Sequence, residues 1–206
     1  MSAVTRRLAL GLLALPALAP FAFPAQGQTM DPGRAAGFIT TTGEELVAVL
    51  NSDAPVEQRR ERVATILRRA VDIEGTGRFI LGRWWRVATP EEQREYLRLF
   101  EETLIRNLAS RFGEFQGVRF TVGRSQTRSE EDVLVTTVVE RPNAPAVTLD
   151  WRVGEVGGQP RIVDLVAEGA SLRLTQRSEY SAVITRSGNR IAALLDAMRG
   201  QIERMG

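Results

Sequence analysis

The fold of this chain is decided by residues 132–167, which read DVLVTTVVERPNAPAVTLDWRVGEVGGQPRIVDLVA. Inward and outward positions alternate in three runs, and this period of two is typical of strands with one buried face. Residues 142–143 and 154–158 are rich in Pro, Asn and Gly and predict turns between the runs. The stretch therefore predicts an antiparallel meander. Its inward positions are Val133, Val135, Thr137 and Val139, then Val147, Leu149, Trp151 and Val153, then Val163, Leu165 and Ala167.

The flanking sequence adds one more strand and several helices. Residues 118–122 alternate in the same way, so we expect about four strands. Upstream, apolar spacing of three and four predicts helices over residues 32–51, from near Pro55, over 79–86 and from Pro90 to Gly113. Asp53 is a candidate cap for the second helix, and Thr89 with Glu92 has the form of a capping box. Two further helices follow the strands, which together predict a single α+β domain.

The amino terminus predicts export. Arg6 and Arg7 precede an apolar run over residues 8–23, which is shorter than the roughly 20 residues of a spanning helix. Small residues at 25–27 form a cleavage site, so we expect residues 1–27 to be a cleaved signal and residues 28–206 to be the mature domain. The paired arginines fit either a general or a twin-Arg signal. Both routes imply a periplasmic protein.

Composition removes several classes of function. The chain has no His, Cys or Lys, so it can form neither a His-dependent catalytic triad nor a thiolate or imidazole metal site. All 27 basic residues are Arg, against 25 Asp and Glu. Loss of Arg6 and Arg7 with the signal leaves 25 of each sign, so the mature chain is formally neutral. The sequence therefore gives no reason to expect nucleic-acid binding, and we expect a monomer.

The remaining candidates for chemistry are carboxylates and tyrosines. Asp150 and Asp164 lie on neighbouring predicted strands, where paired carboxylates can act as acid and base. Because both alternate with apolar residues, we expect them to face solvent and to pair with Arg152 or Arg161. Tyr96 or Tyr180, beside an Asp in a small cavity, would be an alternative catalytic pair.

Three ordered segments resemble a known family. Residues 79–92, FILGRWWRVATPEE, are similar to its LG-x-x-W-x-x-A-x-P/T-E segment. Residues 150–152, DWR, and 162–172, IVDLVAEGASL, resemble its paired strand and its V-x-D-V-x-V-E-G-V-S-L signature, and residues 175–180, TQRSEY, resemble its T-x-R-x-E-F helix start. On these motifs the chain resembles the MlaC family, the periplasmic phospholipid-binding proteins of the Mla pathway, also called the toluene-tolerance or ABC-transporter auxiliary family.

The resemblance implies a soluble periplasmic carrier, not an enzyme. It would shuttle phospholipid between an outer-membrane lipoprotein–porin complex and an inner-membrane ABC lipid transporter with an MCE-type substrate-binding component, and so support outer-membrane lipid asymmetry. The implied fold is a twisted antiparallel sheet with helices packed around it, enclosing an apolar pocket. The implied ligand is a phospholipid cargo, with no cofactor and no metal.

Three alternatives remain open from the sequence. Ala167 and Ala170 stand where the family usually has Val, so a hopanoid-associated relative of the same family is one. The other two are a periplasmic adaptor without cargo and the small-cavity Asp/Tyr enzyme. For the carrier, we expect Arg83 and Arg86 to be possible headgroup contacts. The expected pocket lining combines strand and helix residues, namely Phe79, Trp84, Tyr96, Phe100, Leu104, Val147, Leu149, Trp151, Val163, Leu165, Tyr180 and Ile184.

Overall fold

The computed structural model describes residues 30–110, 112, 114, 116–129, 131–142 and 144–205, and the expected signal over residues 1–27 lies outside them. The helices are α1 (Pro32–Leu50), α2 (Val56–Ala70), α3 (Ile73–Leu81), the short 3-10 helix η1 (Gly82–Arg86), α4 (Pro90–Ala109), α5 (Leu172–Arg186) and α6 (Ile191–Arg204). The strands are β1 (Arg119–Thr127), β2 (Asp132–Arg141), β3 (Ala144–Val156), β4 (Gln159–Ala167) and β5 (Ala170–Ser171).

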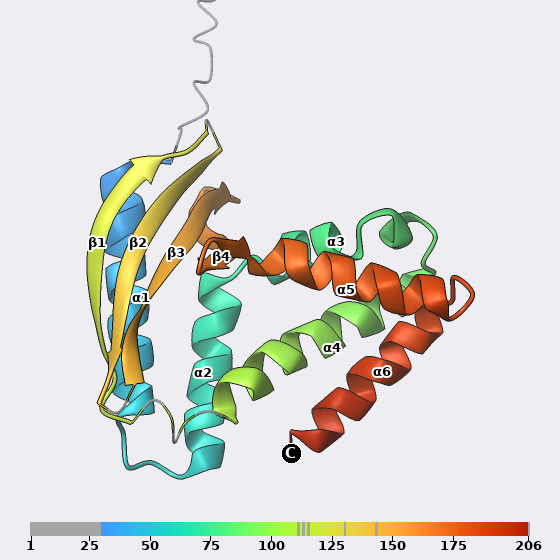
Figure 1. Cartoon of the computed structure of the whole chain (residues 1–206), viewed down its shortest axis with the longest axis horizontal. Coiled ribbons are helices and arrows are strands. Elements are labelled where there is room, and N and C mark those ends of the chain that lie inside the picture. The colour runs from blue at the N-terminus through green and yellow to red at the C-terminus, as the bar shows by residue number, and fades with distance from the viewer. Residues whose placement is uncertain are drawn as a thin grey trace, which may run out of the picture.

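The strands form one antiparallel sheet in chain order. Trp151 on β3 lies opposite Val135 on β2 and Leu165 on β4. Helix α1 packs along this face of the sheet, and the helices from α3 onward extend away from it as a second lobe (Figure 1). The α+β class with an antiparallel sheet is thus confirmed. The fifth strand is only two residues long, which is why alternation did not reveal it.

The alternation predicted for β4 is wrong at Val163. The register shifts next to Arg152, so that Arg152 lies opposite Asp164 while Val153 lies opposite Ile162. Val163 is the extra residue of this bulge, and Ile162 takes the buried position beside Val153. A bulge inserts one residue into one strand of a pair, so it reverses the inside and outside positions beyond it. The alternation of apolar residues in the sequence cannot by itself reveal such a bulge.

The start of α4 follows its sequence signature. The Thr89 hydroxyl accepts a hydrogen bond from the Glu92 amide at 3.2 Å, and the Glu92 carboxylate accepts one from the Thr89 amide at 2.9 Å. These bonds satisfy two backbone donors that the first helical turn leaves free. The helix ends at Ala109, earlier than predicted. The expected cap of α2 is wrong, because Pro55 occupies that position and no side chain caps the helix.

One glycine fixes how α1 meets the sheet. A Cβ built on Gly43 would lie 2.2 Å from the Cζ atom of Phe120, far inside contact distance. The Phe120 ring of β1 therefore packs directly on the helix backbone. This explains a glycine in the interior of a helix, where it lowers helix stability by roughly 1 kcal/mol relative to alanine.

The buried apolar residues form three clusters within the described residues. The sheet cluster lies between α1 and the strands, the helical cluster lies among α3, η1, α4, α5 and α6, and the joint cluster lies where α1, α2 and the end of α4 meet. The sheet cluster contains Met30, Ala35, Ile39, Ala70, Val133, Val135, Val153 and Ile162. The joint cluster contains Val49, Leu50, Val63, Ile66, Phe112 and Val118. The helical cluster contains Ile80, Leu81, Trp84, Ala88, Tyr96, Leu99, Phe100, Tyr180, Ile184, Ile191, Leu194, Leu195 and Met198.

Helix α2 connects the two lobes. Its carboxyl end reaches the sheet, where Ala70 joins the sheet cluster and the amide of Asp72, just beyond the helix, donates to the Ile162 carbonyl at 3.0 Å. Arg69 forms an ion pair with Glu45 of α1, and the Arg68 guanidinium lies 2.7 Å from a carboxylate oxygen of Glu101 on α4. Helix α2 and its ion pairs therefore form one of the connections between the lobes.

Candidate functional site

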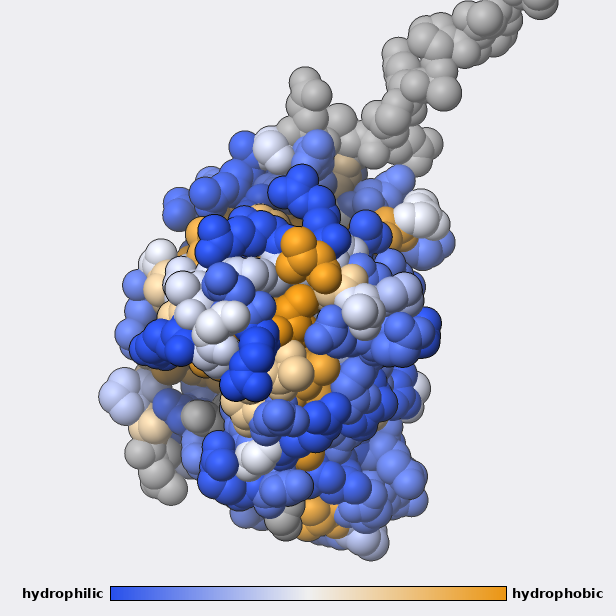
Figure 2. Space-filling view, turned by 90° about the vertical axis from the view of Figure 1, so that its right-hand side faces the viewer, coloured by the Kyte–Doolittle hydropathy of each residue, from blue (hydrophilic) through white to orange (hydrophobic). Residues whose placement is uncertain are grey.

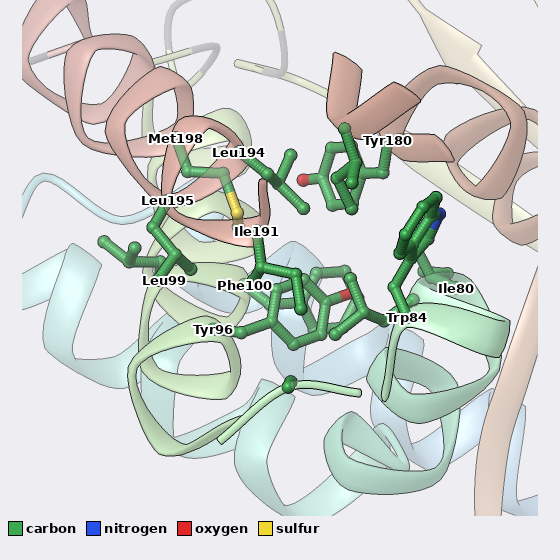
Figure 3. Close-up of a cluster of buried hydrophobic side chains, with 13 residues drawn as sticks. Ile80, Trp84, Tyr96, Leu99, Phe100, Tyr180, Ile191, Leu194, Leu195 and Met198 are labelled. Carbon is green, nitrogen blue, oxygen red and sulfur yellow. The ribbon is translucent and has the colours of Figure 1, made fainter. Parts of the chain in front are cut away.

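The helical lobe gathers most of the helix residues expected to line a pocket. Trp84, Tyr96, Phe100, Tyr180 and Ile184 belong to the helical cluster (Figure 3). The Tyr96 ring stacks near Phe100 with centroids 6.0 Å apart and meets Tyr180 edge-on at 6.2 Å. The two remaining helix residues, at positions 79 and 104, are partly buried against the same cluster.

The two tyrosines are held as neutral phenols. Burial raises the pKa of Tyr96 well above its ordinary value, with a smaller contribution from Tyr180. Burial also raises the pKa of Tyr180 to about 12, assisted by the charge of Glu179. Desolvation has this effect because a phenolate is poorly stabilised away from water. The Tyr96 hydroxyl donates to the Gly77 carbonyl at 3.0 Å, which gives it a structural partner.

The strand residues expected in the pocket lie elsewhere. Trp151 packs against the sheet cluster, and its indole N–H donates to the Thr137 hydroxyl at 2.8 Å. Val163 sits at the bulge, beside Gly154. The structure therefore divides the twelve expected residues between two lobes, with the helix set in one cluster and the strand set on the sheet.

A patch of half-buried apolar residues continues the buried sheet face beyond its helical cover. We call it the sheet corner, and it comprises Val147, Leu149, Leu165 and Ala167. Leu149 lies between Thr137 and Ala167 across the strands, and Leu165 lies opposite Trp151. Thr137 is fully buried, whereas all four corner residues stay partly exposed. They belong to none of the three clusters.

The acid of β4, Asp164, has a different role from the one expected. Asp164 is only 5% exposed, so the expectation that it faces solvent is wrong. Its carboxylate accepts hydrogen bonds from the Ser171 hydroxyl at 2.6 Å, from the Leu165 amide at 2.8 Å and from the Arg173 amide at 3.2 Å. The chain reverses over residues 168–169 and brings the start of α5 onto this carboxylate. Asp164 therefore anchors α5 to the sheet.

The charges around Asp164 form a compact network. The Arg173 guanidinium lies 3.3 Å from the carboxylate, and Arg152 lies 4.0 Å from it while also pairing with Asp132. Burial lowers the pKa of Arg173, and repulsion from Arg152 lowers it further. The Arg173 guanidinium also stacks over the Phe79 ring of α3 at 4.3 Å. The predicted pairing with Arg152 is thus present, but sequence reasoning missed Arg173 because helix docking brings it there.

Asp150 does not join this network. It is half-buried and accepts a hydrogen bond from the Thr136 hydroxyl at 2.5 Å. Across the strands it lies opposite Val166, whereas Asp164 lies opposite Arg152. The two acids therefore have separate partners.

The two arginines expected near a headgroup lie on η1. The Arg83 guanidinium stacks over the Trp84 ring at 4.6 Å, and both Arg83 and Arg86 are exposed. Neither forms an ion pair with another described residue. They belong to the helical lobe, so the structure does not place them next to the sheet corner.

The described residues contain neither a metal-binding cluster of acidic side chains nor a membrane-spanning helix. No group of three or more His, Cys, Asp or Glu side chains is arranged to hold a metal ion. In the same part of the chain, none of the helices combines the length and the apolar character needed to cross a membrane.

Comparison with known proteins places the chain in a family. A solved structure of the phospholipid-binding protein from Ralstonia solanacearum, in complex with a phospholipid, superimposes with a TM-score of 0.74 at 21% identity. The match covers 83% of this chain and 98% of that one, which shows a shared fold. The family model for the MlaC protein matches residues 40–200, most of the 206-residue chain. The chain therefore belongs to the MlaC family.

Proposed function

We propose that this protein is a periplasmic phospholipid carrier. Residues 1–27 direct export and are removed, and residues 28–206 form the domain that binds one phospholipid as cargo. The carrier exchanges this cargo with an outer-membrane lipoprotein–porin complex and with an inner-membrane ABC transporter through its MCE-type component. Membership of the MlaC family and the phospholipid held by the Ralstonia solanacearum structure support the binding step.

The sheet corner is the observation that carries this proposal. Its apolar side chains continue a buried face, yet they remain partly exposed and lie outside all three clusters. Two acyl chains hold on the order of 25 to 30 methylene groups, and each costs about 0.8 kcal/mol in water, or roughly 20 kcal/mol together. A carrier must supply an apolar surface of this kind, and it needs no catalytic group to do so.

We place the acyl chains against Val147, Leu149 and Leu165, with Trp151 at one end of this surface. The indole N–H of Trp151 already bonds to Thr137, so its ring can offer an apolar face without leaving a donor unpaired. The helix residues of the expected lining belong to the helical cluster or pack against it. They would form the core of the lobe that faces the cargo. Only those at its edge, such as Leu104, would touch the lipid, because the Phe79 ring is covered by the guanidiniums of Arg173 and Arg177.

Native mass spectrometry tests the proposal. The mature protein, purified without detergent, is expected to carry a bound mass equal to one phospholipid. Leu149→Arg should empty the site while shifting the melting temperature by only a few degrees, because Leu149 borders exposed space. Thr148→Arg is the matched control, since its side chain lies on the opposite face of the same strand.

Two results would contradict the proposal. A wild-type protein that carries no lipid and takes none from vesicles is not a carrier. If Leu149→Arg unfolds the protein, Leu149 belongs to the core and the assigned surface is wrong. A bound mass of a hopanoid would change the class of cargo, while the site would remain the same.

A further inference from the structure

One face of α5 is left uncovered by the rest of the described chain. It carries a shallow, open depression of about 710 Å³, which we call the α5 groove, lined by Leu174, Arg177, Ser178, Ser181, Ala182, Thr185 and Arg186. These residues recur at spacings of three and four, so they form one stripe along the helix. At 1.5 Å per residue the stripe is about 18 Å long. That is longer than a single phosphate group requires.

The polar groups of the α5 groove are all able to donate hydrogen bonds. They are the guanidinium groups of Arg177 and Arg186 and the hydroxyls of Ser178, Ser181 and Thr185. Ser181 accepts the indole N–H of Trp84 at 3.4 Å, which leaves its own proton free. The lining contains no carboxylate and no amide side chain. A surface rich in acceptors, such as one of phosphate groups, can pair with these donors.

The cations next to the groove are fixed and not neutralised by ion pairs. Arg177 donates to the Phe79 carbonyl at 3.2 Å, stacks over the Phe79 ring and packs against Gly82, the first residue of η1. Arg83, which follows, stacks over Trp84. Among the described residues neither of these arginines forms an ion pair, and the same holds for those at positions 86, 186 and 190.

This clustering of charge is not an effect of composition. The chain from residue 28 onward contains 25 Arg and 25 acidic residues, so a uniform surface would be neutral. The only acid of α5 is Glu179, which accepts a hydrogen bond from Gln176 at 3.1 Å. The helical lobe therefore carries a local excess of positive charge over η1 and α5.

Exposed aliphatic side chains accompany these arginines. Val87, directly after η1, is 67% exposed, and Leu174 in the groove is 54% exposed. Figure 2 views the helical lobe from its free side and shows hydrophobic residues gathered in a short band between hydrophilic ones. Exposed aliphatic groups beside arginines are typical of surfaces that rest on a membrane, because the aliphatic groups enter the headgroup layer while guanidiniums bind phosphates.

We propose that the α5 groove and the arginines of η1 bind the phosphate groups of an anionic phospholipid bilayer. The contact is separate from the cargo surface on the sheet. Arg83 and Arg86, expected from sequence to meet the headgroup of the cargo, would here meet headgroups of the membrane. A bilayer is favoured over a protein partner because the exposed aliphatic side chains of Val87 and Leu174 accompany arginines that form no ion pair among the described residues.

Vesicle flotation tests the proposal. Vesicles of phosphatidylcholine mixed with phosphatidylglycerol should bind the mature protein with an affinity that falls as salt rises, and vesicles of phosphatidylcholine alone should bind it far less. Each arginine near an anionic surface contributes about a fivefold gain in affinity, so Arg177→Gln with Arg186→Gln should lose at least tenfold. The double variant Arg62→Gln with Arg124→Gln removes the same charge from exposed positions elsewhere and should bind like wild type.

Three results would overturn it. Equal loss in both double variants would mean that bulk charge drives binding. Equal binding to both vesicle types would exclude electrostatic recognition. Failure to bind any pure lipid vesicle, with association only when membrane proteins are present, would identify a protein as the partner.

Native mass spectrometry of the same variants separates this inference from the carrier function. The groove double variant should still hold lipid cargo, and the empty Leu149→Arg protein should still bind anionic vesicles. If the groove double variant melts well below wild type, Leu174→Asn serves in its place, because it leaves the Arg177 contacts intact. Leu174→Asn should weaken vesicle binding by several-fold. Unchanged binding by Leu174→Asn would also count against the proposal.

Discussion

Replacement of Asp164 by alanine should be among the most damaging single changes to the stability of this protein. The substitution removes three hydrogen bonds, from Leu165, Ser171 and Arg173, and an ion pair with the Arg173 guanidinium. Removing one partner from a buried charge pair costs about 3 to 5 kcal/mol, because the other charge stays in a poorly solvated site. We therefore expect Asp164→Ala to lower the free energy of unfolding by about 4 kcal/mol.

Urea denaturation of residues 28–206, followed by circular dichroism, measures this loss as a lower midpoint at constant slope. Asp164→Asn keeps an acceptor oxygen but not the charge, so its loss should be smaller. Asp196→Ala serves as the control, since Asp196 forms an ion pair with Arg199 at 2.8 Å but is 73% exposed, and it should cost at most about 1 kcal/mol. A loss in Asp164→Ala no larger than in the control would refute the anchoring role of Asp164.

Three further changes test other parts of the fold. Arg98 and Arg199 hold the pKa of Glu95 down to about 2. The stability that this carboxylate contributes is therefore present above pH 4.5 and is lost as the pH falls toward 2. Glu95→Gln should make the melting temperature depend less on pH over that range. Tyr96→Phe should cost about 1 to 2 kcal/mol in urea because it leaves a buried backbone carbonyl without its donor. Gly43→Ala should cost about 1 to 3 kcal/mol by forcing Phe120 off the helix, and a stabilised variant would contradict that packing.

Local patterns predicted much of the fold. The capping box at Thr89 and Glu92 and the period-two runs act over a few residues, so the sequence contains all the information needed to find them. The bulge at Val163 escaped because register depends on how neighbouring strands pair. The burial of Asp164 escaped because it depends on α5 folding back over β4.

The grouping of the candidate site residues was not predictable from the sequence. The expected lining consists mainly of apolar residues, but their division between the helical cluster and the sheet depends on packing between distant elements, which no short pattern encodes. The α5 groove was missed for a related reason. Its stripe holds mostly small polar residues, and a stripe of this kind stands out only when the structure leaves it uncovered.

The division of the core determines which motions leave the protein intact. Because the helical and sheet clusters have no buried residue in common, each lobe has its own dry interior, and the network of Asp164 with Arg173 is a buried polar contact between them. Amide hydrogens of α4 and α6 would then exchange with solvent independently of those of β2 and β3, as two separately protected units. Such independent protection would show that neither lobe relies on the interior of the other for its folding.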